Sequence, residues 1–319
     1  MTHMLKAICV GEILYDCFYE QTNDKDTCIH LKCFPGGAPA NVSIGLSRLG
    51  VPTGFIGAIG NDYLGDQIYQ FLKKEKVDLT HLQVKERFPT SLTIVTKNIQ
   101  NTFISYCEAD SKLKYVEKLN KYVHNSDFFI FNGVTLSRDS KTCLVELINI
   151  ASKSGKIITF DINWRPLLWE DKNHAKKEFT KYINVSNIIK LNLVELNLIT
   201  NSFNPKSILH YINNLDQKIF LITCGYKGAY YLTKKYFKFI ESFKIDEIDD
   251  TGCGDSFLSA FIYKMLQYNI NNIYDQPYDI INNIMRFSNA SGAITATKQS
   301  TMSVYPNLSD INEFVKNRH

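Results

Sequence analysis

The sequence predicts an α/β fold with three layers, in which helices cover both faces of a mostly parallel central sheet. Short apolar segments rich in β-branched and aromatic residues alternate with longer segments of helical periodicity. Polar residues stand where several of the apolar segments end, as ligand-binding residues do in open α/β sheets. The 319 residues suit one large domain, so we expect a single domain over 1–319.

Composition excludes several classes of function. The net charge of +4, from 36 basic and 32 acidic residues, is too weak and scattered for a nucleic-acid-binding protein. The seven histidines lack the spacing of a zinc site. The apolar run Ala7–Val10 is too short for a signal peptide, and no stretch is long enough to span a membrane. Without any CxxC pair, the eight cysteines read as reduced thiols of a cytoplasmic protein (residues 9, 17, 28, 33, 107, 143, 224 and 253).

In the first half of the chain, buried strands are apolar runs of four to seven residues, and helices carry apolar residues three or four apart. Pro39 suits a helix start, and Gly50 suits a helix end. Residues 17–34 lack helical periodicity and would leave the main sheet. The expected strands are Leu5–Val10, Gly54–Ile59, Thr90–Thr96, Phe103–Cys107 (paired with 90–96 around Asn98–Asn101) and Phe128–Phe131; the expected helices are about 39–49, 66–74 and Ser111–Tyr122.

The second half follows the same alternation and ends with two long helices. The two apolar runs Ala229–Leu232 and Tyr236–Ile240, which follow a glycine-rich entry at Gly225 and Gly228, predict a hairpin. The remaining expected strands are Ile157–Phe160, Ile188–Leu191 and Phe220–Thr223, and the helices are Lys141–Lys153, one from about 253, and Ile280–Thr297.

The most informative stretch is Ile248–Leu258, where a glycine turn leads into an apolar helix. A helix start leaves backbone N–H groups unpaired and carries partial positive charge, and glycines let a phosphate approach it closely. Asp255 lies in the first turn, where it repels phosphate but can take a proton from an attacking hydroxyl. The alternative is an ordinary glycine loop with Asp255 as a helix cap. The stretch is neither a Walker loop nor a dinucleotide fingerprint.

Other strand ends carry residues suited to a hydroxyl-rich ligand. Asp16 follows the first strand and can accept hydrogen bonds from sugar hydroxyls, although an isolated Asp is more often a solvated loop acid. Gly36 and Gly37 permit unusual backbone angles, and Asn41 offers a donor and an acceptor from the first turn of the next helix. A plain strand–helix connection remains the alternative for this second stretch.

Three later strand ends suit a phosphate and a metal. Arg165 can stabilise phosphate oxygens, unless it only pairs with Asp161 to hold its loop. Asn192 and Glu195 share a helix face; Glu195 could hold Mg²⁺ through water, or the two could simply form a capping box. Gly225 and Gly228 could support a nucleotide. Small residues in 280–297 would admit an adenine ring or, more commonly, a neighbouring helix.

Taken together, the motifs resemble those of the ribokinase-like (PfkB-type) carbohydrate kinases, and most closely fructokinases. They occur in family order over nearly the whole chain, which makes the match highly specific. The matching runs are Gly11-Glu12 with Asp16, Gly36–Val42, Asp161–Trp169, Asn192–Glu195, Thr223–Gly225 with Lys227-Gly228, and Asp249–Asp255.

The resemblance implies a ribokinase-like α/β core of roughly nine strands with a small β lid from residues 14–34 and 89–108. It implies Asp255 as the catalytic base, backbone N–H groups of Gly252, Cys253 and Gly254 as the anion hole, and Arg165 near sugar or phosphate. Further implied roles are sugar binding (Asp16, Gly36, Gly37, Asn41), ATP binding (Asn192, Thr223, Gly225, Lys227, Gly228, Asn289), Mg²⁺ at Glu195, and a candidate K⁺ site at Asp249 and Thr251.

The chain departs from the family pattern at three places. Asp250 stands for a Thr and Cys253 for an Ala in the family's DTTGAGD motif, and Ile162 replaces a Pro. Ser300-Thr301 replaces a Gly-Ala pair in a loop that helps hold a monovalent cation in relatives, which puts potassium activation in question.

We therefore expect an ATP-dependent kinase that converts D-fructose into fructose 6-phosphate, with lid strands that pair two subunits into a homodimer. One alternative is a kinase for another sugar or a nucleoside, such as ribose or 2-keto-3-deoxygluconate. The other is a non-catalytic relative that binds sugar or nucleotide. Neither nucleic acid nor membrane is an expected partner.

Overall fold

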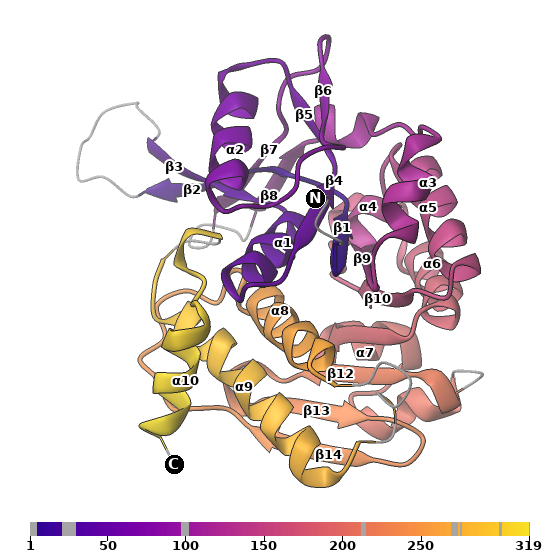
Figure 1. Ribbon diagram of the computed structural model, residues 1–319, viewed down its shortest axis with the longest axis vertical. Helices are drawn as coiled ribbons and strands as arrows, with labels where there is room; N and C mark the ends of the chain where they lie inside the picture. Colours follow the sequence, from indigo (N-terminus) through magenta and orange to yellow (C-terminus); the bar gives the residue numbers. More distant parts are fainter. Residues whose placement is uncertain are drawn as a thin grey trace.

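The central element is an eight-stranded sheet with helices on both faces (Figure 1). The computed structural model describes residues 5–20, 30–96, 102–211, 215–268, 274, 276–299 and 302–318. The strand order is β14-β13-β12-β11-β10-β9-β1-β4, with six parallel strands and an antiparallel edge formed by β13 and β14. The bounds are β1 Ala7–Val10, β4 Thr53–Ile56, β9 Phe128–Asn132, β10 Ile157–Asp161, β11 Ile188–Asn192, β12 Ile219–Thr223, β13 Gly228–Leu232 and β14 Phe237–Glu241.

The helices form the two outer layers because successive strand residues point to opposite faces of the sheet. In β1, Ala7 and Cys9 enter one core, and Ile8 and Val10 enter the other. The first core is closed by α1 (Ala38–Arg48), α2 (Tyr63–Lys74), α8 (Cys253–Leu266) and α9 (Tyr278–Ala296). The second is closed by α3 (Lys118–His124), α4 (Gly133–Leu136), α5 (Lys141–Lys153), α6 (Lys172–Val185) and α7 (Leu193–Thr200); α10 (Leu308–Lys316) packs on α9.

A second sheet lies beside the first, in the order β3-β2-β7-β8. It consists of β2 (Leu14–Glu20), β3 (His30–Gly36), β7 (Leu92–Thr96) and β8 (Thr102–Tyr106). A two-stranded sheet pairs β5 (Ala58–Gly60) with β6 (Gln83–Lys85). The short 3₁₀ helices are η1 Ala109–Lys112, η2 Pro166–Leu168, η3 Pro205–His210, η4 Leu215–Gln217, η5 Gly225–Lys227 and η7 Met302–Val304.

Most predicted elements are found within one or two residues, but three details differ. The segment Ser111–Tyr122 is not one helix: the chain forms η1 and then α3, with Leu113 buried between them. The strand Gly54–Ile59 is divided into β4 and β5 at Gly57, and the main sheet has eight described strands instead of roughly nine. The predicted turn Asn98–Asn101 and the pair Ser300-Thr301 lie outside the described residues.

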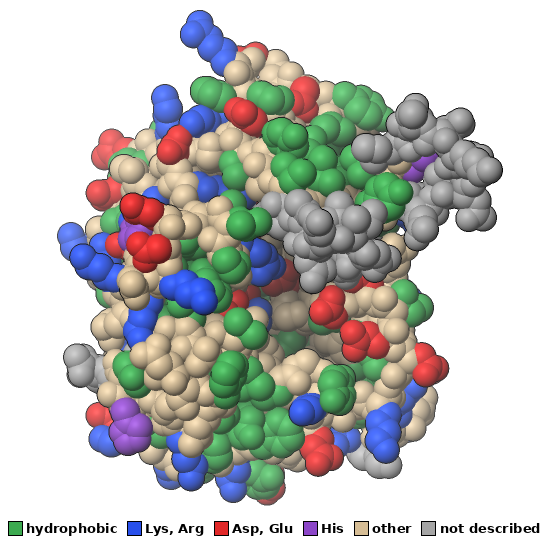
Figure 2. Space-filling view, turned by 180° about the vertical axis from the view of Figure 1, so that it is seen from behind, with side chains coloured by type: hydrophobic (Ala, Val, Ile, Leu, Met, Phe, Trp, Pro, Cys, Tyr) green, Lys and Arg blue, Asp and Glu red, His purple; other side chains and the backbone are tan. Residues whose placement is uncertain are grey.

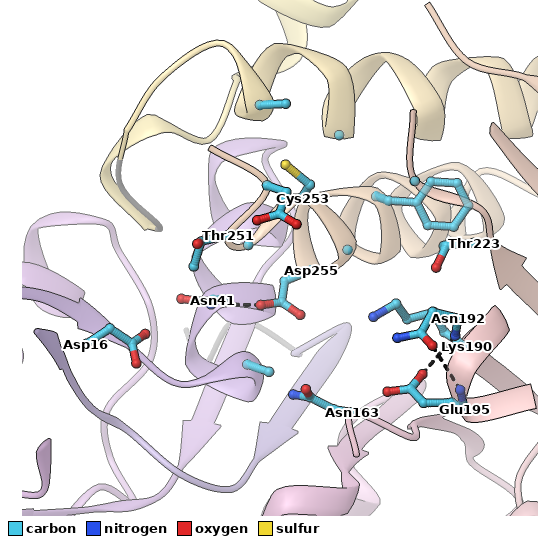
Figure 3. Close-up of a pocket in the computed structure, with 18 of the residues that line it drawn as sticks. Asp16, Asn41, Asn163, Lys190, Asn192, Glu195, Thr223, Thr251, Cys253 and Asp255 are labelled. Carbon is cyan, nitrogen blue, oxygen red and sulfur yellow. Dashed lines mark hydrogen bonds between the residues drawn. The ribbon is translucent and has the colours of Figure 1, made fainter. Parts of the chain in front are cut away.

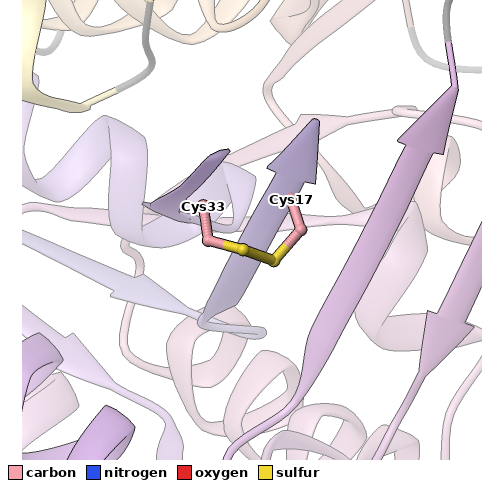
Figure 4. The surroundings of a disulfide bond; sticks show 2 residues. All are labelled: Cys17 and Cys33. Atoms are coloured by element: carbon pink, nitrogen blue, oxygen red, sulfur yellow. A yellow bond between two sulfur atoms is a disulfide. The ribbon is translucent and has the colours of Figure 1, made fainter. Parts of the chain in front are cut away.

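Two cysteines contradict the prediction that all thiols are reduced. Cys17 of β2 and Cys33 of β3 form a disulfide (Figure 4). Their side chains meet because the two residues are directly opposite each other in the antiparallel ladder, a relationship that needs the register of the sheet. The described free cysteines are residues 9, 107, 143, 224 and 253. As for membranes, none of the described helices is both long and apolar enough to cross one.

We predict that the disulfide makes a measurable contribution to the free energy of unfolding. Replacing both Cys17 and Cys33 by Ser should lower the free energy of unfolding by about 3 kcal/mol, because the bond closes a loop with a sequence separation of 16. Denaturant unfolding without reductant measures this difference, and peptide mapping should recover the two residues in one linked fragment. With excess reductant, wild type and variant should unfold alike; equal stability without reductant would show that the bond does not form.

Candidate active site

A cavity of about 680 Å³ lies at the edge of the sheet where the parallel strands end. Figure 2 shows the molecule hollowed near its middle, with acidic and basic side chains at the hollow. The sheet, α1, α7, α8, α9 and the second sheet all contribute to its lining. The predicted site residues that line it are Asp16, Gly37, Asn41, Arg165, Asn192, Glu195, Thr223, Gly225, Gly228, Thr251, Gly252, Cys253, Gly254, Asp255 and Asn289. Gly36, Lys227 and Asp249 are predicted residues that do not line it.

The N-terminus of α8 faces this cavity through a tight glycine turn. Gly252 is the N-cap residue with φ of 76°, and the Tyr305 hydroxyl donates to its carbonyl oxygen over 3.1 Å. The Asp249 carboxylate accepts hydrogen bonds from the N–H and hydroxyl of Thr251, which fixes the turn. The Cys253 N–H donates to the Asp250 carbonyl oxygen over 3.2 Å. The Gly252 and Gly254 N–H groups take part in none of the hydrogen bonds found among the described residues.

Asp255 lies in the first turn of α8, and its side chain reaches the same cavity. The residue is only 8% exposed, and its Oδ2 accepts a hydrogen bond from Asn41 Nδ2 over 2.7 Å (Figure 3). Burial raises the pKa of Asp255 to about 7, with the charge of Lys190 opposing the rise and that of Asp161 adding to it. A carboxyl group with this pKa can exchange a proton near neutral pH.

Asp16 lies on the far side of the cavity, on strand β2 of the second sheet (Figure 3). Burial raises its pKa to about 7, with Arg165 and Arg138 opposing the rise. Gly36, at the end of the neighbouring strand β3, leaves room for this carboxylate, since a side chain at Gly36 would collide with Asp16 Oδ2. Although it lines no part of the cavity, Gly36 therefore provides the space that the Asp16 carboxylate occupies.

The turn into α1 is held by a residue to which the sequence assigned no role of its own. The buried Glu12 carboxylate accepts hydrogen bonds from the Ala38 N–H, Asn132 Nδ2 and the Thr135 hydroxyl. This ties the end of β1 to the end of β9 and to the first residue of α1. Gly37, with φ of 106°, has no space for a side chain against the Glu12 carbonyl oxygen.

Asn192 and Glu195 form the capping box that the sequence left open as an alternative. The Glu195 carboxylate is 3% exposed and accepts N–H hydrogen bonds from Trp164 and Asn192, each over 2.8 Å. Burial raises its pKa. The described residues contain no group of three or more His, Cys, Asp or Glu able to hold a metal ion. One carboxylate that acts through water fits a magnesium ion bound mainly to phosphates.

The other end of the cavity is lined by small residues. Gly225 lines it from the β12–β13 connection, Gly228 and Ala229 from the start of β13, and Gly292, Ala293 and Ala296 from α9. Asn289 also lines it, but its Nδ2 donates to the carbonyl oxygens of Ile240 and Glu241 and so joins α9 to β14. The Lys227 ammonium lies over the ring of Tyr226, which lines the cavity, but Lys227 itself does not line it.

The alternative reading of Arg165, a pair with Asp161, is wrong. Asp161 pairs with Lys190, whose Nζ lies 2.9 Å from Asp161 Oδ2, whereas Arg165 is exposed at the cavity. Lys190 and Arg138 are cavity residues that the sequence analysis missed. A charged residue inside the apolar run Ile188–Leu191 was the available signal for Lys190. The sequence around Arg138, which pairs with Asp110, contains no pattern that predicts a place in the cavity.

A helix N-terminus, a neighbouring carboxyl group of raised pKa and a large cavity are together suited to phosphoryl transfer to a small molecule. Residues 4–308 match the model of the pfkB family of carbohydrate kinases, and the chain belongs to that family.

Individual relatives agree with this assignment. A probable fructokinase-3 of Arabidopsis thaliana is 30% identical over 291 residues, which cover 89% of this chain and 83% of the relative. A fructokinase of Xylella fastidiosa solved with bound ATP superposes with a TM-score of 0.87 at 21% identity, covering 98% of both chains. A fructokinase of Vibrio cholerae with bound fructose, ADP and calcium ion gives a TM-score of 0.83 at 22% identity, covering 98% of this chain and 99% of the other. The protein is a sugar kinase with the ribokinase-like fold.

The glycine at the start of α8 yields a prediction with a matched control. Gly252 and Gly50 have similar backbone angles, with φ of 76° and 83°, but only Gly252 has a neighbour where a side chain would be, the Tyr305 hydroxyl at 2.6 Å. Gly50→Ala should cost about 1–2 kcal/mol of unfolding free energy from backbone strain alone and keep full activity. Gly252→Ala should cost more and lower kcat, because the turn must shift. Denaturant unfolding and steady-state kinetics test both, and equal effects of the two changes would exclude a role for the turn.

Proposed function

We propose that this protein transfers the γ-phosphoryl group of ATP to the primary hydroxyl of D-fructose, which gives fructose 6-phosphate and ADP. The single observation that carries the mechanism is Asp255, a carboxyl group with a pKa of about 7 beside the open N-terminus of α8. The choice of fructose is supported by the fructokinase relatives and by the neighbour that holds fructose and ADP.

The sugar is proposed to bind between Asp16 and Asp255. Asp16 reaches the cavity from β2, with Gly36 giving it space, and Gly37 and Asn41 line the cavity from the start of α1. Carboxylate and amide groups are suited to hydroxyl recognition, since each can accept two or more hydrogen bonds. Arg165, exposed at the same end, would approach the sugar or the phosphate.

In the proposed reaction, Asp255 takes the proton of the sugar hydroxyl while the hydroxyl oxygen forms a bond to the γ-phosphorus. The bond from phosphorus to the β–γ bridging oxygen breaks, and its electron pair leaves with ADP. The N–H groups of Gly252 and Gly254 stabilise the charge on the transferred group. We assign the anion hole to these two groups, because the N–H of Cys253 already donates to Asp250.

The nucleotide is proposed to lie along Asn192, Thr223, Gly225 and Gly228 towards α9, with Asn289 behind it and Lys227 outside the cavity lining. Glu195 would hold Mg²⁺ through water, and the metal would offset the charge of the phosphates. Asp249 and Thr251 remain the candidate ligands of a monovalent cation; the buried carboxylate of Asp249 already fixes Thr251.

We propose that the four-stranded sheet β3-β2-β7-β8 is a lid of a single kinase domain that covers the sugar and excludes water. Exposed apolar side chains on this sheet, Leu31, Ile104 and Tyr106, support its pairing with a second copy in a homodimer. A cytoplasmic location stays a prediction, now without the argument from reduced thiols.

The experiment that tests this function is ADP release from ATP and Mg²⁺ across a panel of fructose, ribose, 2-keto-3-deoxygluconate and nucleosides. Fructose should give the highest kcat/KM. Faster turnover of another member would replace fructose as the substrate. No turnover with any member, together with tight binding of sugar or nucleotide, would indicate a non-catalytic relative.

The role of Asp255 predicts a dependence on pH. The carboxyl group must be ionised to accept a proton, and its pKa is about 7, so kcat/KM should rise with pH through about 7 and then level off. Asp255→Asn should keep sugar and ATP binding, measured by calorimetry, but reduce kcat at least ~10²-fold, the usual effect of losing a positioned base.

The same variant supplies the control. Its residual kcat at saturating sugar should no longer rise through pH 7, because the proposed base is gone. Asp16, whose pKa is also raised to about 7, is proposed to bind the sugar and would act on KM instead. A rate near that of wild type, or an unchanged pH profile in Asp255→Asn, would remove Asp255 from its proposed role.

A further inference from the structure

Lys190 is a buried lysine in the middle of the main sheet that the proposed mechanism has not used. It is the third residue of β11, between Ile189 and Leu191, which point into the opposite core. Its own side chain points to the α8 side, where its ammonium lines the cavity (Figure 3). Only 11% of this side chain is exposed, so a large desolvation cost must be offset by its surroundings.

The ammonium of Lys190 is held in place by a carboxylate that is itself almost fully buried. Its Nζ donates to Asp161 Oδ1 over 3.1 Å and to Asp161 Oδ2 over 2.9 Å, and the Asp161 side chain is 3% exposed. An ammonium has three N–H donors. Two of them are used in this bidentate contact with Asp161, and the third is available for another acceptor. Burial alone would lower the pKa of Lys190, but the charges of Asp161, Asp255 and Glu195 outweigh burial and raise it, so the lysine is cationic at neutral pH.

The position of this cation is unusual for a purely structural ion pair. A side chain added at Gly254 would have its Cβ 2.8 Å from Lys190 Nζ, so the ammonium lies against the first turn of α8. A positive charge beside a helix N-terminus is unfavourable, because that end already carries partial positive charge. The Gly254 N–H and the Lys190 ammonium are therefore two neighbouring hydrogen-bond donors at the cavity lining, as a site for a phosphoryl oxygen requires.

We propose that Lys190 is a catalytic residue that donates a hydrogen bond to a non-bridging oxygen of the transferred phosphoryl group, from the side opposite Asp16. Asp161 is then a positioning residue that orients the ammonium. The inference rests on the proposed function, since it takes the phosphoryl group to lie at the start of α8. Lys190 stays protonated throughout: the proton of the hydroxyl goes to Asp255, and the lysine only offsets charge on the phosphoryl oxygens.

Removing the charge tests the proposal. Lys190→Met should reduce kcat by about 10²-fold or more, the usual effect of losing one donor to a developing negative charge, while KM for fructose changes by no more than about threefold. Lys218→Met is a matched control. Lys218 is another buried lysine, whose Nζ donates to three backbone carbonyl oxygens (residues 183, 184 and 186), and it does not line the cavity. This control should lower stability and leave kcat unchanged.

A double variant separates catalysis from simple charge pairing. Lys190→Met leaves the buried Asp161 carboxylate unpaired, and the added change Asp161→Asn removes that charge. The pair Lys190→Met/Asp161→Asn should therefore recover thermal stability without recovering kcat. Recovery of wild-type kcat by the double variant would show that Lys190 only neutralises Asp161, and would overturn the proposal.

Amine rescue gives an independent readout. In Lys190→Ala, added ethylammonium should raise kcat in a saturable manner, because a free cation can occupy the vacated space; the same amine should not change wild type or Lys218→Met. Absence of rescue, with kcat lowered only in proportion to folded protein, would also overturn the proposal. If the wild-type protein turns over no sugar at all, the proposed function is wrong. If the wild-type protein is active but the Lys190 variants give either of the overturning results described above, only the role of Lys190 is wrong.

Discussion

The site depends on the balance of charge around one buried carboxyl group, Asp255. Burial raises the pKa of Asp255 to about 7, and the carboxylate of Asp161 adds to that rise. Lys190 and the Asn41 amide act in the opposite direction and limit the rise of this pKa. Without the lysine, two buried carboxylates would face the helix N-terminus with no cation between them. Stability and reactivity of the site therefore depend on the same few charges.

The backbone around this carboxyl group is held from outside the cavity. The loop after α9 brings Tyr305 to the carbonyl oxygen of Gly252, and Arg48 of α1 fixes that loop through hydrogen bonds to the carbonyl oxygens of Ser303 and Tyr305. Arg48 also pairs with Glu75 at the end of α2. The start of α8 is thus oriented by residues distant in the chain, which explains how unpaired N–H groups can persist at the cavity.

The side of the cavity that Asp16 lines is held by a different part of the chain. Asp16 comes from the four-stranded sheet, in which the Cys17–Cys33 disulfide links the strand that carries Asp16 to the strand that leads to Gly36 and Gly37. Glu12 fastens the same glycine turn to the main sheet. Asp16 and the glycine turn are therefore positioned by contacts other than those that hold the start of α8, and Asn41 of α1 joins the two sides through its hydrogen bond to Asp255.

Local patterns in the sequence determined the order of most strands and helices, the glycine turn before α8, and the residues at the strand ends. These follow from periodicity and backbone freedom, which neighbouring residues alone decide. Tertiary structure decided the pairings. The partner of Asp161 is Lys190 and not Arg165, Cys17 meets Cys33, and Asn289 bonds to β14, because each contact joins residues far apart in the chain. The same is true of the pKa of Asp255, since its burial and its neighbouring charges come from α1, β10 and β11.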